Sequence, residues 1–361
     1  MEDSKRYSHI DLMETIAIFF VITYHSTLYS FEITGIDSAL YYFRYFGRTI
    51  LSTCVPLFFF VNGYLLFNKQ FDLKKHIKKI LKLIILVFVW ALILMPAYLA
   101  ISGEPLDIKV ILDSISNLSI PWSMNIFWFI GALVCLYILF PVLKISFDKD
   151  KRIFCFFIIV CAIFTFGTVL GDQLLTIEGI VFHQKYNGLN YPVFLMFNPF
   201  REIRGYSFVY FCLGGMIYTY EDRILSVSKI KRNVISASGI ILSCSLLFLI
   251  GILYSKYNDG EMWDVVWNGY DSVFTLFNVL FIYVLCLNYK GCNKFIISIS
   301  KNTLGIYFLH KLIVRLTHPW IITVPALCNN AFNLFYAFSI MCICLLICIL
   351  MRKIPVLRKL I

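Results

Sequence analysis

The stretch ILKLIILVFVWALILMPAYLAI, residues 80–101, decides the fold, because Lys82 is its only charged residue. At 1.5 Å per residue a helix of this length spans roughly 33 Å, close to the bilayer's hydrocarbon core of about 30 Å. Apolar runs of similar length occupy residues 153–170 and 331–351. The chain is therefore predicted to be an all-α polytopic membrane protein.

The overall composition points the same way. Of the 361 residues, 60% are hydrophobic and 15% are charged, whereas a soluble domain has about 45–50% apolar and about 25% charged residues. Too little polar sequence remains to cover so many apolar helices with a water-exposed surface. The first apolar run, residues 10–31, is not followed by a small-residue cleavage site, so it is interpreted as a permanent first helix rather than a signal peptide.

The apolar runs predict about ten transmembrane helices in a single domain over residues 1–361. The expected ranges are 10–31, 50–67, 80–101, 126–143, 153–170, 206–219, 234–254, 271–288, 303–316 and 331–351. When the first loop is placed outside and sides alternate, 23 of the 32 Lys and Arg residues fall on the inner side and 7 on the outer side. This asymmetry follows the positive-inside rule and predicts that both termini are cytoplasmic.

Net charge and cysteine content exclude other classes of protein. The formal net charge of +11 is attributed to cytoplasmic loops and membrane lipid rather than to nucleic acid. The twelve cysteines contain no CxxC pair, so neither a disulfide framework nor a metal site is expected.

Ionisable groups at membrane depth are costly and therefore informative. The first helix carries Glu14 and His25, eleven residues apart, which places both near one face about three turns apart. A neutral imidazole can accept a proton at neutral pH, so His25 is a candidate general base. The alternative is a neutral histidine that donates one hydrogen bond between helices. His310, in the ninth predicted helix, is the second candidate for such a base.

A basic cluster follows the second predicted helix, in which Pro56 and Gly63 are expected to loosen the helix. Its residues are spaced as on a helix at the cytoplasmic side: Lys74, Lys75, His76, Lys78, Lys79 and Lys82, of which Lys75, His76, Lys78 and Lys79 are the candidates for binding a donor phosphate. The cluster could bind the phosphates of a donor molecule. It could equally anchor the topology or attract anionic lipid.

The outer segment 255–270 is aromatic and acidic, with Trp263, Asp264 and Trp267. Aromatic faces beside carboxylates suit sugar rings. The alternative is the belt of Trp and Tyr that membrane proteins form at the interface.

Five runs, in this order, resemble the acyltransferase 3 family of bacterial membrane acyltransferases, many of which O-acetylate cell-surface polysaccharides. They are DLMETIAIFFVITYHS (11–26), VPLFFFVNGYLL (55–66), WFIGALVCLYILFPVL (128–143), YFCLGGMIY (210–218) and NTLGIYFLHKLI (302–313). The family's first-helix histidine corresponds to His25. Eleven residues earlier the family usually has Arg or Lys, where this chain has Glu14, and the usual Arg-x-x-Arg pair is best matched by His76 and Lys79.

The resemblance implies a membrane-bound O-acyltransferase in the plasma membrane of a bacterium, without an appended extracellular esterase-like domain. Acetyl-CoA, or another acyl-CoA, would be the co-substrate rather than a permanently bound cofactor, and a glycan supplied by glycan-synthesis machinery would be the acceptor. His25 would act as general base or as covalent acyl carrier. Supporting groups, including donors to a tetrahedral oxyanion, would come from a set of six: Glu14, Arg44, Arg48, Asn62, Tyr64 and His310.

The alternative function is a polysaccharide or small-molecule exporter of similar topology, because broken helices and buried charges also mark transport pathways. The sequence shows no paired repeat halves, which disfavours this alternative.

Overall fold

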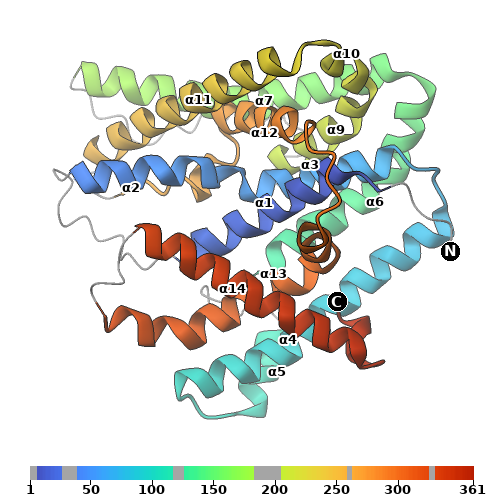
Figure 1. Ribbon diagram of the computed structural model, residues 1–361, viewed down its shortest axis with the longest axis vertical. Helices are drawn as coiled ribbons and strands as arrows, with labels where there is room; N and C mark the ends of the chain where they lie inside the picture. The colour runs from blue at the N-terminus through green and yellow to red at the C-terminus, as the bar shows by residue number, and fades with distance from the viewer. Residues whose placement is uncertain (1–5, 27–38, 117–125, 183–204, 258–261, 325–329) are drawn as a thin grey trace. The chain divides into compact units, whose positions relative to one another are not determined.

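The computed structural model describes residues 6–26, 39–116, 126–182, 205–257, 262–324 and 330–361. Within these ranges the chain is helical and contains no strand. The elements are α1 (Ser8–His25), α2 (Ala39–Thr49), η1 (Ile50–Thr53), α3 (Cys54–Phe67), α4 (Leu73–Ser102), α5 (Ile108–Ser116), α6 (Phe127–Lys149), α7 (Lys151–Val181), α9 (Gly205–Ile217), η4 (Tyr218–Tyr220), α10 (Glu221–Ser226), α11 (Lys229–Tyr257), η5 (Trp267–Gly269), α12 (Val273–Cys286), α13 (Lys294–Ile322), α14 (Asn330–Lys353) and η7 (Leu357–Lys359) (Figure 1).

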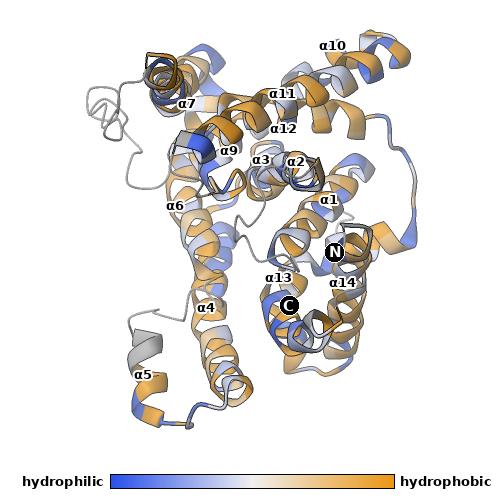
Figure 2. Cartoon of the chain, turned by 90° about the vertical axis from the view of Figure 1, so that its left-hand side faces the viewer, coloured by the Kyte–Doolittle hydropathy of each residue, from blue (hydrophilic) through white to orange (hydrophobic). Residues whose placement is uncertain are grey.

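Six helical stretches of the described residues are long and apolar enough to cross a membrane, and α12 is apolar but shorter. The six are Tyr41–Phe67, Leu73–Ser102, Phe127–Lys149, Lys151–Val181, Lys229–Lys256 and Phe332–Lys353. Apolar residues predominate along them, as the orange ribbons of Figure 2 show. The predicted polytopic helical class is confirmed, while the count of ten spans and the cytoplasmic termini stay predictions.

Large apolar side chains on the outer faces of these helices explain why the chain needs a membrane. On α7, for example, Phe156 is 67% exposed and Ile159 is 57% exposed. A helix with apolar residues on its outward face as well as its inward face is typical of contact with lipid.

Helix ends follow the local sequence. Asp72 lies immediately before α4 and accepts a hydrogen bond from the backbone N–H of Lys75, which satisfies one of the free donors of the first turn. The same helix ends at Gly103, whose φ of 72° lies in the left-handed region that favours glycine. Asn293 caps α13 in the way that Asp72 caps α4.

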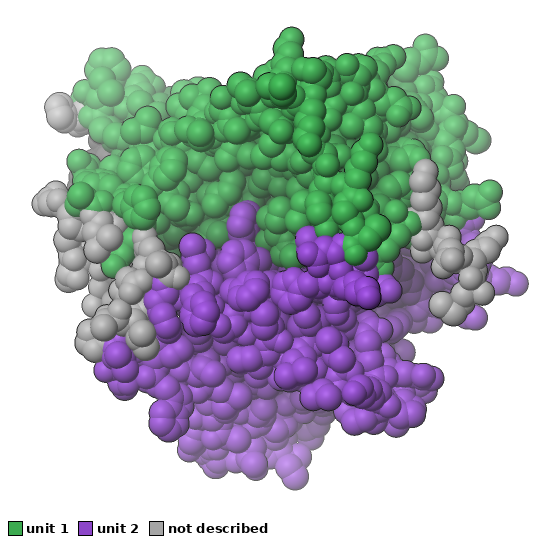
Figure 3. Space-filling view, in the orientation of Figure 1, with its two compact units in different colours: residues 1–17, 30–70, 142–292 green, residues 18–29, 71–141, 293–361 purple. Residues whose placement is uncertain are grey.

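The chain divides into two compact units, each assembled from segments distant in sequence (Figure 3). Unit 1 comprises residues 1–17, 30–70 and 142–292, and unit 2 comprises residues 18–29, 71–141 and 293–361. The first helix contributes to both units. The expectation of a single domain over residues 1–361 stays a prediction.

In unit 1 the core is the close pairing of α3 with α9. A Cβ added to Gly63 would lie 2.6 Å from the carbonyl carbon of Phe211, and one added to Gly214 would lie 2.8 Å from that of Phe60. The two glycines therefore let the helix backbones touch, which is how helices commonly associate in lipid. α3 is continuous from Cys54 to Phe67 through Pro56 and Gly63, and the expected loosening of the helix at these two residues stays a prediction.

In unit 2, α13 packs against α14 and against α4, and α13 and α14 run side by side in Figure 1. The Trp90 ring of α4 stacks on Phe308 of α13, with centroids 5.0 Å apart and planes 16° apart. The hydroxyl of Tyr307 donates to the carbonyl oxygen of Ile126, just before α6, at 2.7 Å. These contacts hold the part of α13 that contains the buried polar residues His310 and Lys311.

Candidate active site

Two histidines from opposite ends of the sequence meet in unit 2. His25 is the last residue of α1, and His310 lies in the middle of α13. Their rings stack with centroids 5.3 Å apart and planes 30° apart. Stacked rings do not hydrogen-bond to each other through their in-plane nitrogens, so each imidazole keeps its nitrogens for another group.

The environments of the two rings differ. His310 is fully buried, whereas His25 is half-buried. The Nδ1 of His310 faces the carbonyl oxygen of Tyr307, and because a carbonyl only accepts, Nδ1 is assigned the proton. Nε2 is then an acceptor, and it is buried without a hydrogen-bond partner among the described residues. His310 therefore presents a neutral, fixed base in a water-poor place.

A cation lies beside the two rings. Lys311 follows His310, is only 9% exposed, and interacts electrostatically with both imidazoles. A buried ammonium is costly, so its position next to two imidazoles makes this cluster a candidate functional site.

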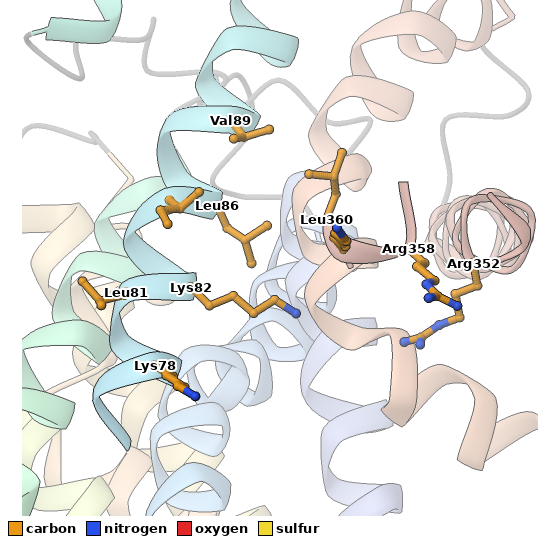
Figure 4. A pocket seen from close by; sticks show the side chains of 10 residues that line it. Lys78, Leu81, Lys82, Leu86, Val89, Arg352, Arg358 and Leu360 are labelled. Atoms are coloured by element: carbon orange, nitrogen blue, oxygen red, sulfur yellow. The ribbon is translucent and has the colours of Figure 1, made fainter. Parts of the chain in front are cut away.

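Unit 2 also contains a cavity of about 750 Å³ at the end where α4 begins and α14 ends. Half of its lining is basic and half aliphatic: Lys78, Leu81, Lys82, Ile85, Leu86, Val89, Arg352, Arg358, Lys359 and Leu360. Figure 4 shows Lys82 extending from α4 toward the C-terminal segment, where Arg352 and Arg358 lie next to each other. No acidic residue lines it, so the cavity suits an anion with an apolar part.

Trp90 connects the cavity to the histidine pair. Its ring stacks on Phe308, two residues before His310, and its Nε1 donates to the carbonyl oxygen of Leu360, which lines the cavity. Asn302, which accepts a hydrogen bond from Arg352 of the cavity, precedes His310 by eight residues on α13, or about 12 Å along the helix axis. A flexible chain bound in the cavity could reach the histidines over that distance.

Unit 2 thus combines a buried imidazole pair with a basic cavity, and the family of the chain is found by comparison. Residues 7–353 match the model of the acyltransferase 3 family, described as an acyltransferase domain. The chain belongs to the acyltransferase 3 family. The resemblance seen in the sequence is thereby confirmed, and the protein is a multi-pass membrane acyltransferase. Neither a curated protein nor a solved structure matches it.

The histidine that corresponds to the first-helix histidine of the acyltransferase 3 family is thus one of the pair, His25. Its stacking on His310 brings together two candidates that the sequence places in separate helices. The local sequence around either histidine does not predict that the two rings stack. Each histidine could be singled out only because it is an ionisable residue inside an apolar helix.

The predicted donor-binding residues of this family member are only partly brought together. Lys78 lines the cavity. His76 is buried and donates from Nε2 to the carbonyl oxygen of Tyr137 at 2.7 Å, and Lys79 lies 4.7 Å above the Tyr137 ring. Lys75 is exposed and lies 3.4 Å from the Asp72 carboxylate.

Lys82, another member of the predicted basic cluster, also lines the cavity, which adds three cations outside that cluster, namely Arg352, Arg358 and Lys359. All three follow the last apolar run, residues 331–351, where the positive-inside rule alone accounts for basic residues. Nothing in the sequence signals that this segment folds back onto α4.

The remaining candidates, Glu14, Arg44, Arg48, Asn62 and Tyr64, lie in unit 1. Arg48 pairs with Asp264 at 3.2 Å, and the Asn62 amide donates to the Phe58 carbonyl of its own helix. The Tyr64 hydroxyl donates to a Glu221 carboxylate oxygen at 2.7 Å and lies 3.2 Å from His9 Nε2. His9 is at the opposite end of α1 from His25. Arg48, Asn62 and Tyr64 thus each have a partner within unit 1, and their supporting role in the reaction stays a prediction.

Proposed function

We propose that this protein is an O-acetyltransferase, which moves an acetyl group from cytoplasmic acetyl-CoA to a hydroxyl of an exported or lipid-linked polysaccharide in the plasma membrane of a bacterium. The observation that carries the proposal is the pair of stacked imidazoles, half-buried His25 and fully buried His310, beside nearly buried Lys311. The family gives the reaction class, and the pair supplies the base that acyl transfer to a hydroxyl needs.

In the proposed reaction, the His25 imidazole takes the proton of the sugar hydroxyl as its oxygen attacks the thioester carbonyl. The new C–O bond gives a tetrahedral oxyanion, and Lys311 is placed to stabilise that charge. The C–S bond then breaks, the CoA thiolate leaves, and the imidazolium returns the proton to the sulfur. In the alternative route His25 itself carries the acetyl group between the two steps.

The donor is proposed to bind with its phosphates in the basic cavity. The cations of the cavity attract phosphate as charges and, for the two arginines, also as paired donors. The acetylated arm would extend along α13 toward His310, over the distance of about 12 Å from Asn302. Leu86 and Val89, which also line the cavity on α4, give this arm an apolar wall.

The acceptor is proposed to be a glycan because of an aromatic and acidic cluster in unit 1. Tyr254 stacks on Trp263, with centroids 5.3 Å apart and planes 24° apart. The Tyr254 hydroxyl donates to a carboxylate oxygen of Asp172 at 3.2 Å. Half-buried ring faces beside a carboxylate offer both the stacking surface and the hydrogen-bond acceptors that a sugar uses.

The test is acetyl transfer by the full-length protein in lipid nanodiscs, with radiolabelled acetyl-CoA and extracted surface glycan. His25→Gln keeps hydrogen-bonding ability but cannot serve as the base, so the rate should fall by about a hundredfold to ten-thousandfold. His318→Gln is the matched control: His318 lies on the same helix as His310, is half-buried and is outside the pair. Equal rates of acetyl transfer for the two variants would show that His25 is not the base of the reaction.

Two further measurements separate the alternatives. Label retained on wild-type protein without glycan, and absent from His25→Gln, would establish the covalent route. In cells, deletion of the gene should leave glycan at the surface without acetyl groups. Loss of surface glycan itself, with no acetyl transfer in nanodiscs, would favour the exporter.

A further inference from the structure

The cavity in unit 2 is closed on one side by the end of the chain. Arg352 is near the end of α14, and Arg358, Lys359 and Leu360 belong to the short turn that follows it. Among the described residues, none of the five cations that line the cavity forms an ion pair. Five uncompensated positive charges around one space repel each other, and a bound polyanion would relieve that repulsion.

The C-terminal segment is held against the rest of unit 2. The indole of Trp90 donates to the Leu360 carbonyl oxygen at 3.0 Å, and Arg352 donates to the carbonyl oxygen of Lys301 at 2.7 Å. A Cβ added to Gly305 would lie 2.7 Å from the Cγ2 of Ile361, so this glycine makes room for the last residue. The backbone of the segment and the Arg352 side chain are therefore held in place, while the exposed side chains of Arg358 and Lys359 are carried next to the cavity by that backbone.

Topological anchoring does not account for this arrangement. Positive charges that only retain a loop in the cytoplasm need to lie near the membrane, and they need not line one cavity or belong to a segment that is hydrogen-bonded to distant helices. Here charges from α4 and from the chain end face the same cavity (Figure 4). The aliphatic residues between them, such as Leu86 and Leu360, would pack on an apolar part of the same ligand.

We propose that the C-terminal segment, residues 352–360, is part of the donor site and that Arg358 and Lys359 bind the phosphates of the adenosine end of CoA. This inference rests on the proposed function, since that function supplies the identity of the polyanion. The same chemistry could serve a phosphate-bearing lipid headgroup, so the experiment distinguishes the two sources.

The first measurement needs no catalysis. Adenosine 3′,5′-bisphosphate is titrated by calorimetry into full-length protein in nanodiscs of zwitterionic lipid. The double variant Arg358→Gln/Lys359→Gln should bind it at least about tenfold more weakly, because charge-assisted contacts are lost. The charge-matched control is Lys353→Gln/Lys294→Gln, since both lysines are exposed, belong to unit 2 and do not line the cavity. Equal affinities of the two double variants would overturn the inference.

The second measurement is kinetic. In the Arg358/Lys359 variant the KM for acetyl-CoA should rise about tenfold or more, with kcat unchanged, because the contacts are to a non-reacting part of the donor. Acetyl-pantetheine lacks the phosphorylated adenosine and should give wild-type constants with the same variant. A loss that is equal for both donors would contradict the assignment of these residues to the phosphates.

The lipid alternative and the proposed function fail in separate ways. Bisphosphate binding that persists in zwitterionic lipid supports the nucleotide, whereas binding of anionic lipid that depends on Arg358 and Lys359, without bisphosphate binding, overturns it. If bisphosphate binding depends on Arg358 and Lys359 but no glycan is acetylated, the donor site is supported and the proposed glycan acceptor is wrong. If the protein acetylates glycan but bisphosphate binding is unchanged by substitution of both residues, the proposed function is supported and the assignment of Arg358 and Lys359 is wrong.

Discussion

Substitution of Gly63 by alanine tests the packing on which unit 1 is built. The added Cβ would lie 2.6 Å from the carbonyl carbon of Phe211 and closer still to its oxygen. Carbon atoms in contact prefer about 3.5–4.0 Å, so α3 and α9 would have to separate by roughly 1 Å. The obstacle is helix backbone, which cannot rotate away as a side chain can.

The expected cost follows from two opposing terms. Alanine favours the helical state over glycine by about 0.5–1 kcal/mol. Overpacking a tight interface costs about 1–3 kcal/mol and more where backbone is the neighbour. We therefore expect a net destabilisation of about 1–2 kcal/mol, together with loosening along the whole α3–α9 contact.

Gly167→Ala is the control, because a Cβ at this position of α7 meets nothing within 4 Å. It should retain only the helix-propensity gain and be neutral or stabilising. Thermal unfolding of both variants in the same detergent measures the difference. A midpoint for Gly63→Ala equal to or above that of Gly167→Ala would show that α3 and α9 do not touch as described.

Two other predictions concern the start of α4 and the topology. The hydrogen bond from the backbone N–H of Lys75 holds the pKa of Asp72 below its ordinary value, so the cap stabilises the first turn above pH about 3.9 and is lost as the pH falls through the lower folded value. The protection factor of the Lys75 amide, which compares its hydrogen-exchange rate with that of an unstructured amide at the same pH, should fall there. Asp72→Asn, which does not titrate, should abolish this pH dependence of the protection factor. In intact cells, a membrane-impermeant thiol reagent should label Asn268→Cys and spare Lys78→Cys; the opposite pattern would invert the orientation.

The sequence predicts the membrane fold because its signal is cumulative. The long apolar run of a helix such as α4 is sufficient to predict it, and no knowledge of tertiary contacts is needed. The amphipathic α2, ALYYFRYFGRT, contains too many polar residues for a window of apolar residues to find it. Gly63 shows what the sequence alone does not reveal. A glycine within a helix is expected to weaken it, whereas in the structure the absence of a Cβ allows α3 to pack closely against α9.

The candidate site is predictable only in its parts. His25 and His310 each stand out because a histidine within an apolar helix is rare, yet their stacking depends on how α1 and α13 pack. The C-terminal cations carried no signal beyond net charge, because the folding back of that segment depends on the Trp90 contact with Leu360. Local chemistry therefore selects candidates, and long-range packing decides which of them share a space.

The hydrogen bonding of His310 allows a role in acyl transfer to be separated from a role in packing the core. Its Nδ1 faces the Tyr307 carbonyl, and its Nε2 has no partner among the described residues. An asparagine at this position places an amide nitrogen near Nδ1 and nothing near Nε2. His310→Asn should therefore satisfy the Tyr307 carbonyl and preserve the fold while removing the buried acceptor.

If Nε2 positions the acceptor hydroxyl or His25, His310→Asn should lower kcat for acetyl transfer by at least about tenfold, as general acid–base and positioning groups do. The KM for acetyl-CoA and the midpoint of thermal unfolding should change little. His310 does not line the donor cavity and lies about 12 Å along α13 from Asn302, which contacts the cavity residue Arg352, and the buried carbonyl keeps its donor. His310→Ala, which leaves the Tyr307 carbonyl without that donor, should in addition lower the unfolding midpoint. Wild-type turnover in His310→Asn would assign His310 to the core and leave His25 as the one imidazole of the reaction.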